Sequence, residues 1–450
     1  LTQKERQRKG GWGLYYHVDY VGTPRNSKWL NVTPTQNMWE QLTLAQQYGI
    51  DRLWVLNVGD LKPMEYQIDF FLDMAWKGKP VENILKHTRQ FCAQQFGEEQ
   101  ADEAARILNL GAKYAGRSTG EMLDAKTYNI ETGDWERAVA DYDRLEADAL
   151  RQYLSLPQVF RDCYDQLVLF PIQAMVNLYR MYYAQAKNHQ LAARKDSEAN
   201  YWADEVVRYF RQDSLLMLHY NRDIAGGKWN GMMTQKHIGY KTWNDNFPCD
   251  ILPDIKRIDS QTEGGFVFRA EQGYLSIEAE HFYAKTDANA ARWTLIPFMG
   301  RTRSALSLQP YDKPVDDASL QYRFASPKEV QNEATLHVIT KCTLDFLNQG
   351  GLRYAVSIDS DAPQTVNFNE RLNIKKENVY SIYYPTVARR VVDQKVRLTQ
   401  EQTRRLLDGK EHTLTITPLD PGIVFEKIIL DFGGYQPQYL FGKESPYTVR

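Results

Sequence analysis

A dense group of polar and aromatic side chains lies near the start of the chain. Tyr15, His17 and Tyr20 fall within a β-rich run, and Arg25 follows in a Gly-Pro-Arg loop. A purely structural strand more often carries Val, Ile or Leu at so many positions. Imidazole and phenol groups can hydrogen-bond to sugar hydroxyls, and a guanidinium can grip a carboxylate through two hydrogen bonds. The pattern predicts a pocket for an acidic sugar, with a surface salt bridge as the alternative for Arg25.

A second apolar run, residues 52–58, contains one polar interruption, Asn57. An unpaired buried amide costs about 1–3 kcal/mol, so Asn57 needs a hydrogen-bond partner. A sugar hydroxyl and a neighbouring backbone group both remain open as that partner.

Side-chain alternation along the first run makes a further prediction. In an extended strand, alternate side chains point to opposite faces. Tyr15, His17 and Asp19 are therefore expected on one face, and Tyr16 and Tyr20 on the other, until the chain leaves the sheet.

Each of these runs is followed by a helical pattern, over residues 34–48 and 62–76. Strands that alternate with helices favour a parallel sheet, whose functional residues gather at the carboxyl ends of the strands. Two such units fit the last part of a (β/α)8 barrel but cannot close one. We therefore expect an upstream barrel segment of the same protein to supply the remaining strands.

The rest of the chain predicts two further domains, giving a multidomain α+β protein. Residues 1–80 are predicted to form the barrel part. Residues 81–258 are predicted to form an α-helical bundle with an ordered loop over 226–258, because apolar residues recur at helical spacing before that loop. Residues 259–450 carry short alternating runs separated by Pro, Gly, Asp and Asn. This spacing predicts a C-terminal β-sandwich.

Composition excludes several classes of function. The formal net charge is −2, which gives no broad positive field for nucleic acid. No apolar run approaches the roughly 18–20 residues of a membrane-spanning helix. The 4 cysteines form no CxxC pair. We expect no metal site and no organic cofactor.

Two other motifs allow more than one interpretation. The run Glu278-Ala279-Glu280 is similar to the opening strand of several carbohydrate-binding modules, whose carboxylates can help to hold a structural calcium ion. Plain edge-strand carboxylates are the alternative. Four residues of the 226–258 loop could border a cleft or anchor an ordered loop: Trp229, His237, Tyr240 and Trp243.

Four segments together resemble one known family. They are residues 10–31 (GGWGLYYHVDYVGTPRNSKWLN), 53–63 (LWVLNVGDLKP), 228–243 (KWNGMMTQKHIGYKTW) and 420–434 (DPGIVFEKIILDFGG). They are similar to the corresponding segments of glycoside hydrolase family 115, the xylan α-1,2-glucuronidases. The similarity spans nearly the whole chain.

The resemblance implies an enzyme that removes glucuronic acid or 4-O-methyl-glucuronic acid side groups from glucuronoxylan by an inverting mechanism. It implies that His17, Tyr20 and Asn57 line the uronic acid pocket, with Tyr15 beside them. The general acid of the family lies on an earlier barrel strand, and Asp19 and Asp60 match no catalytic position. The resemblance therefore assigns no catalytic residue within this chain.

The same resemblance implies a homodimer, and xylan degradation implies a periplasmic or extracellular location. One alternative is a non-catalytic carbohydrate-binding protein for acidic xylan. Another is a structural or interaction fragment whose aromatic strand end is buried against an absent segment.

Overall fold

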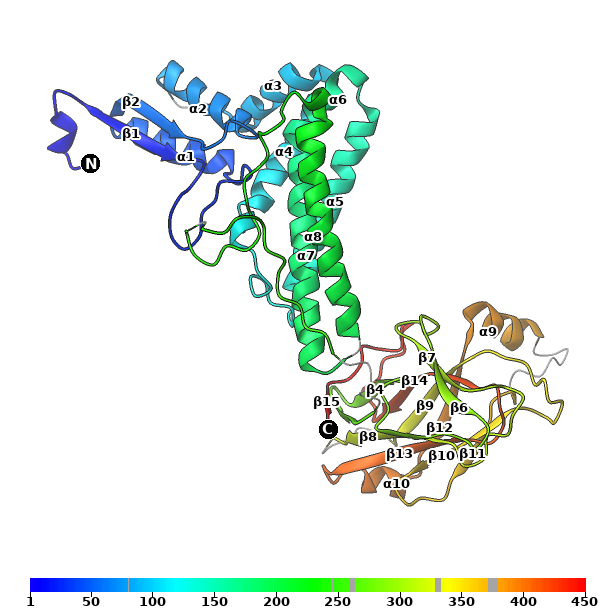
Figure 1. Cartoon of the computed structure of the whole chain (residues 1–450). Coiled ribbons are helices and arrows are strands. Elements are labelled where there is room, and N and C mark those ends of the chain that lie inside the picture. The colour runs from blue at the N-terminus through cyan, green and yellow to red at the C-terminus, as the bar shows by residue number, and fades with distance from the viewer. Residues whose placement is uncertain (80, 197, 245, 259–263, 328–332, 371–378) are drawn as a thin grey trace. The chain divides into compact units, whose positions relative to one another are not determined.

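The computed structural model describes residues 1–450 apart from 80, 197, 245, 259–263, 328–332 and 371–378. The chain divides into two compact units, Leu1–Ile258 and Asp259–Arg450 (Figure 1). The expected strand–helix units and the expected helical region both lie in the first unit. Among the described helices, none combines the length and the apolar character needed to cross a membrane.

The first unit begins with two parallel strands, β1 (Trp12–His17) and β2 (Ile50–Asn57). Each is followed by a helix, α1 (Thr35–Gln47) and α2 (Glu65–Lys77). This arrangement confirms the predicted order and the parallel pairing. In the described part of the chain the sheet contains these two strands alone, and the barrel stays a prediction.

The two faces of this small sheet differ in burial. Leu14, Tyr16 and Trp54 point toward the core that α1 and α2 build around Met38 and Phe70. The alternate residues point the other way, as a strand period of two requires. On that face Leu53 is 66% exposed and Tyr15 61% exposed. The helices therefore cover one face, and the other is open.

The helical region follows, and its longest helices pack side by side (Figure 1). Its α-helices are α3 (Ile84–Phe96), α4 (Ala101–Ala115), α5 (Asp134–Ser155), α6 (Gln158–Tyr164), α7 (Phe170–Ala193) and α8 (Glu198–Arg222). Short turns intervene at η2 (Glu98–Gln100), η3 (Gly120–Met122), the π-helical η4 (Asp165–Leu169) and η5 (Ile224–Gly227), and η1 (Glu5–Gln7) precedes β1. Buried residues of α5 recur every three or four positions, so one stripe faces the core.

The core of the helical region also takes in residues from the loop after β1. Trp29, Leu30 and Val32 belong to the same buried cluster as the helices. The loop that follows the first predicted site strand is therefore packed against the helices.

After η5 the chain runs without helix or strand over most of residues 228–258, and side-chain amides hold it in place. Asn188 of α7 donates to the carbonyl of Lys256 at 2.7 Å and accepts from its N–H at 2.8 Å. Asn200 of α8 makes the same pair of bonds with Ile258 at 2.9 and 3.1 Å. These bonds satisfy backbone groups that no strand pairs with.

The second unit consists mainly of strands. They are β3 (Phe266–Arg269), β4 (Tyr274–Glu278), β5 (Ala284–Thr286), β6 (Arg292–Ile296), β7 (Ala305–Gln309), β8 (Ser319–Ala325), β9 (Thr335–Lys341), β10 (Arg353–Ile358), β11 (Gln364–Asn367), β12 (Val391–Arg397), β13 (Glu411–Pro418), β14 (Val424–Asp431) and β15 (Tyr447–Val449). The short helices η6 (Val379–Tyr383), α9 (Tyr384–Arg389) and α10 (Gln400–Arg405) interrupt them.

Most of these strands pair antiparallel in two sheets. One has the order β11-β10-β13-β8-β3-β15, with β5 on β8, and the other has the order β12-β9-β14-β7-β6, with β4 on β14. One buried cluster draws its side chains from both sheets, including Leu275, Tyr322 and Ile428. Two sheets around one core are the arrangement expected of a sandwich.

Candidate functional site

The predicted site begins where β1 and β2 end together, because His17 and Asn57 are partners in the parallel register. The side-chain amide nitrogen of Asn57 lies 3.0 Å from Nδ1 of His17, and the carbonyl oxygen of Asp19 lies 3.2 Å from the same Nδ1. An amide N–H donates and a carbonyl accepts, so Nδ1 serves one of them at a time. In either case Nε2 of His17 has no partner among the described residues and is open to a ligand.

Two tyrosines flank this histidine. The ring centroid of Tyr15 lies 5.0 Å from that of His17, and the centroid of Tyr20 lies 6.2 Å from it. Both tyrosines are exposed. The predicted alternation of faces does not extend to Tyr20, because β1 ends at His17 and the chain then turns out of the sheet. Two backbone hydrogen bonds of 2.8 Å to Ser27 fix Tyr20 after that turn.

Asp19 lies beneath this group, only 3% exposed. Its Oδ1 has no hydrogen-bond partner among the described residues, and burial raises the pKa of its carboxyl group. A Cβ placed on Gly59 would lie 2.0 Å from Oδ2 of Asp19, and Gly59 has a φ of +62°. The turn after β2 thus needs glycine at position 59 both for its backbone angle and to make room for this carboxyl group.

Arg25 is engaged away from the two strand ends. Its Nη2 pairs with Asp124 at 2.9 Å, and its Nη1 donates to the carbonyls of Glu121, Met122 and Leu123 at 3.1–3.3 Å. The structure therefore brings Tyr15, His17, Tyr20 and Asn57 together. Arg25 instead links the loop after β1 to the helical region. A carboxylate ligand would have to compete with four acceptors for this guanidinium.

Glu121 of the helical region forms hydrogen bonds to the same loop. Its Oε1 accepts the backbone N–H groups of Lys28 at 2.6 Å and Trp29 at 2.9 Å. The side chain is buried, and burial raises the pKa of its carboxyl group. The sequence gives little signal for this role, because Glu121 lies in a short turn about 90 residues beyond its partners.

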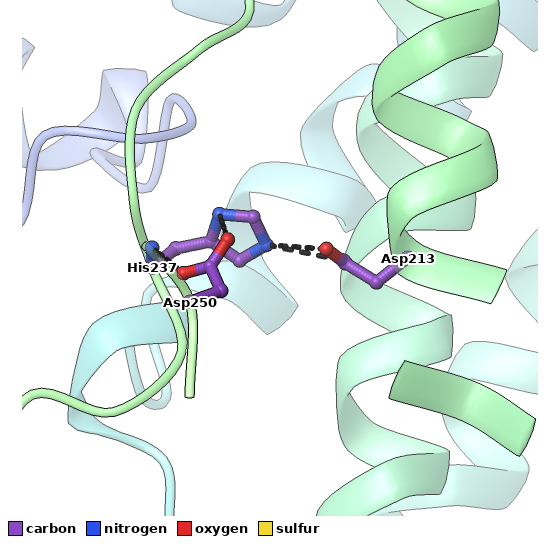
Figure 2. A group of neighbouring side chains, drawn as sticks. All are labelled: Asp213, His237 and Asp250. Atoms are coloured by element: carbon purple, nitrogen blue, oxygen red, sulfur yellow. Dashed lines mark hydrogen bonds and ion pairs between the residues drawn. The ribbon is translucent and has the colours of Figure 1, made fainter. Parts of the chain in front are cut away.

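A second histidine, His237, also contacts this loop and lies between Asp213 and Asp250 (Figure 2). The His237 ring stacks on Trp29, with centroids 3.6 Å apart and planes 2° apart. Its Nε2 lies 3.1 Å from both carboxylate oxygens of Asp213 in α8, and its Nδ1 lies 3.0 Å from the carbonyl of Gln235. A carbonyl can only accept, so Nδ1 carries a proton.

The charge on this buried ring follows from its neighbours. Burial by itself lowers the pKa of His237, but the carboxylate of Asp213 outweighs burial and raises the pKa to about 9. Asp250 contributes in the same direction, with Oδ2 3.7 Å from Nδ1. His237 is therefore an imidazolium at neutral pH, and its ion pair with Asp213 connects the 228–258 loop to α8.

Asp213, His237 and Asp250 are close enough together to be considered as metal ligands. The two carboxylates, however, lie against different ring nitrogens, as Figure 2 shows. Oδ1 of Asp250 already accepts the backbone N–H groups of His237 and Ile238 at 2.7 Å. A single ion cannot bind both ring nitrogens, so this set fits a protonated histidine better than a metal ion.

The remaining aromatic residues of the 228–258 loop favour the ordered-loop interpretation. Tyr240 is buried, and the Nζ of Lys62 lies 3.9 Å from the ring centre of Trp229. Trp243 is half exposed. These contacts anchor the loop next to the segment that follows β2.

Family models match the chain at both ends. The model described as glycosyl hydrolase family 115 matches residues 1–122, and the model of the family 115 C-terminal domain matches residues 267–444. The chain belongs to glycosyl hydrolase family 115. The first match covers every residue of the strand-end group, and the second covers most of the sandwich.

Solved structures give weaker similarities. A family 115 4-O-methyl-α-glucuronidase with specificity for decorated arabinogalactans is 22% identical over 97% of this chain and 53% of its own, with a TM-score of 0.47. This family 115 chain thus spans about half the length of that protein. A family 35 carbohydrate-binding module from Clostridium thermocellum is 14% identical over 35% of this chain and 97% of its own, with a TM-score of 0.23. Among curated proteins, no sequence matches the chain.

In the family 115 sandwich, the Glu-Ala-Glu carboxylates are paired with basic side chains. Glu278 is buried and accepts from Nζ of Lys427 at 2.8 Å and from Oγ1 of Thr302 at 2.6 Å. Glu280 pairs with Arg303 at 2.8 Å. Because these ammonium and guanidinium groups supply the positive charge, the geometry does not favour calcium binding here. Glu278 is also more buried than the predicted edge-strand carboxylate.

Proposed function

We propose that this protein removes glucuronic acid or 4-O-methyl-glucuronic acid side groups from glucuronoxylan with inversion at the anomeric carbon. The observation that carries the proposal is the meeting of His17, Tyr20 and Asn57 at the carboxyl ends of two parallel strands. These ends are where barrel enzymes place their functional groups. Membership of family 115 supports the hydrolase class.

Within this site, different polar side chains are proposed to bind different parts of the sugar. Nε2 of His17 is available to a hydroxyl or to the uronate carboxylate, and the phenol groups of Tyr15 and Tyr20 add donors beside flat ring faces. Asn57 sets the orientation of the imidazole through Nδ1. Such fixed donors favour one orientation of the bound sugar.

An inverting glycosidase needs a carboxylic acid on one side of the sugar and a carboxylate on the other, about 6.5–9.5 Å apart. We propose that the general acid comes from an upstream barrel segment of the same protein. The open, partly apolar face of β1 and β2 supports this proposal, because further barrel strands would enclose it. The proposed role of Asp19 is to pack beneath the strand-end group against Gly59, without contact to the scissile bond.

The test compares two polypeptides, one with the preceding barrel strands and one limited to residues 1–450. We expect the longer protein to release glucuronic acid from glucuronoxylan and residues 1–450 to release none at a comparable rate. Decorated arabinogalactan serves as the competing substrate. Release from arabinogalactan alone would overturn the xylan assignment, and full activity of residues 1–450 would overturn the placement of the acid.

A binding measurement tests the pocket separately. Calorimetry with glucuronic acid should show binding to the wild type that His17→Ala weakens at least tenfold. His189→Ala is the matched control, because His189 lies at the surface of α7 far from β1 in the sequence. Equal affinities for all three proteins would remove the pocket.

We further propose that the protein acts outside the cytoplasm, because a xylan polymer is found there, and that it forms a homodimer. Light scattering of the purified protein tests the dimer, and fractionation of the producing cells tests the location.

A further inference from the structure

The sandwich contains a groove that the proposed hydrolase function does not use. It has a volume of about 650 Å³, within the range of small-molecule sites. We call it the Arg301 groove, and the residues used below are Arg301, Arg389, Asp393, Gln438, Tyr439 and Phe441. They come from the loop before β7, from α9, from β12 and from the segment after β14.

Arg301 is held rigidly at this groove. Its Nη1 donates to the carbonyl of Tyr439 at 2.6 Å, and its Nη2 donates to the carbonyl of Arg389 at 2.9 Å. Its guanidinium carbon lies 4.0 Å from the ring centre of Tyr439 and 4.9 Å from that of Phe441. A guanidinium has five N–H donors, so donors remain after these two bonds. They are already oriented, which lowers the entropy cost of binding an anion.

The groove is lined by more positively charged than negatively charged side chains. Arg301 and Arg389 contribute two positive charges, and Arg389 makes no ion pair within the described ranges. Asp393 is the negative group, and Nδ1 of His337 lies 3.0 Å from one of its oxygens and 3.2 Å from the other. The two guanidinium groups therefore favour an anionic ligand, and planar guanidinium groups suit a carboxylate.

The groove also offers a flat apolar surface and a neutral polar group. Tyr439 is 68% exposed although Arg301 lies over its ring, so part of that ring is open to solvent. Val391 and Pro385 supply apolar contacts, and Gln438 adds an amide. A flat ring beside fixed donors is suited to a pyranose, whose C–H face is apolar and whose rim carries hydroxyls.

We propose that the Arg301 groove binds a carboxylate-bearing oligosaccharide, so that the sandwich contacts the same kind of acidic polysaccharide as the strand-end site. The choice of a uronic acid rests on the proposed function. Arg301 and Arg389 bind the carboxylate, and Tyr439 stacks on the adjacent sugar ring. The groove has no role in bond cleavage.

Calorimetry on the full chain tests this proposal, with a xylo-oligosaccharide that bears one glucuronic acid as the probe. The uncharged xylo-oligosaccharide of equal length is the matched probe. We expect Tyr439→Ala and Arg389→Gln each to weaken the groove affinity at least tenfold. Tyr311→Ala is the control, because Tyr311 is a half-exposed tyrosine of the same unit outside the groove.

The stoichiometry separates the two sites. The wild type should bind two acidic oligosaccharides, His17→Ala should retain the groove site, and Tyr439→Ala should retain the strand-end site. Loss of all binding in His17→Ala, or unchanged binding in both Tyr439→Ala and Arg389→Gln, would overturn the groove proposal. Binding abolished by Tyr439→Ala and unaffected by His17→Ala would support the groove and contradict the strand-end pocket. Equal affinity for the charged and uncharged probes would overturn the carboxylate assignment.

Discussion

His17 and His237 show how one residue type serves two purposes in the same unit. His237 is buried, stacked on Trp29, and has an acceptor at each ring nitrogen. His17 is exposed at a strand end, and its Nε2 has no partner among the described residues. A fully satisfied imidazole holds the fold together, whereas a partly satisfied one at a strand end is available for a ligand.

The comparison therefore makes opposite predictions for the two histidines. Changes around His237 should alter stability, and any effect on sugar binding should follow from movement of the loop. Changes at His17 should alter sugar binding and leave stability nearly unchanged. The following experiments test that separation, in order of decreasing effect on stability.

The largest effect is expected from Asp213→Asn. This change removes the counter-charge of a buried imidazolium, which costs about 3–5 kcal/mol. Asp204→Asn is the control, because Asp204 pairs with Arg257 at the surface and should cost less than about 1 kcal/mol. Urea unfolding of the full chain, followed by tryptophan fluorescence, measures both. Equal losses would show that the buried pair is no more important than a surface pair.

The pH dependence of stability sharpens the comparison. The folded-state pKa of His237 is about 9, above the ordinary value of 6.5. Its stabilisation is therefore complete below about pH 6.5 and is lost as pH rises through about 9, for a total of about 3 kcal/mol. Because the pKa of His219 is also raised to about 9, by Asp165, the quantity to compare is the difference between the wild type and His237→Gln. The same pH slope in both proteins would contradict the assigned charge.

Two glycines with nearly the same backbone angle test the packing of Asp19. Gly59 has a φ of +62° and Gly78 a φ of +61°, and an added Cβ meets Asp19 at Gly59 but open space at Gly78. In both alanine variants the positive φ destabilises the folded state by about 1 kcal/mol. Gly59→Ala should lose about 1–3 kcal/mol more, since it displaces a buried carboxyl group, and should also weaken glucuronic acid binding. Matching unfolding midpoints would show that Asp19 can move freely.

The smallest change in stability is expected from Asn57→Ala. Asn57 lies at the strand end beside an exposed histidine, so the free energy of unfolding should change by less than about 1 kcal/mol. Glucuronic acid affinity should fall at least fivefold, because the imidazole of His17 loses the amide that orients it. Paired unfolding and calorimetry measurements check this. A stability loss as large as that of Asp213→Asn would show that Asn57 mainly stabilises the fold.

Sequence periodicity predicted most of the elements that position the site. The parallel order of β1 and β2 and the strands near Tyr274, Tyr354 and His412 were predicted, because alternation and turn residues are local signals. The meeting of His17 with Asn57 also followed from parallel strands ending at one edge. The interaction of His237 with Asp213 and Trp29 could not be predicted, since its members lie 24 and 208 residues apart.

The structure shows the salt-bridge alternative for Arg25, but neither its partner nor the position of Tyr20 could be predicted, for a related reason. Each depends on what the chain does after leaving the strand. The turn at Val18 places Tyr20 beside His17, and the loop brings Arg25 within reach of Asp124. Neither turn geometry nor a partner about 100 residues away has a local sequence signal.

The stacking of Trp29 on His237 has a consequence for protein engineering. A version of the chain shortened after α2 would keep both strands and every side chain of the strand-end group. It would lose Glu121, Asp124 and His237, which hold the loop that gives Tyr20 its place. Directed evolution toward another sugar should therefore randomise positions near η3 and in the 228–258 loop as well as those that touch the ligand.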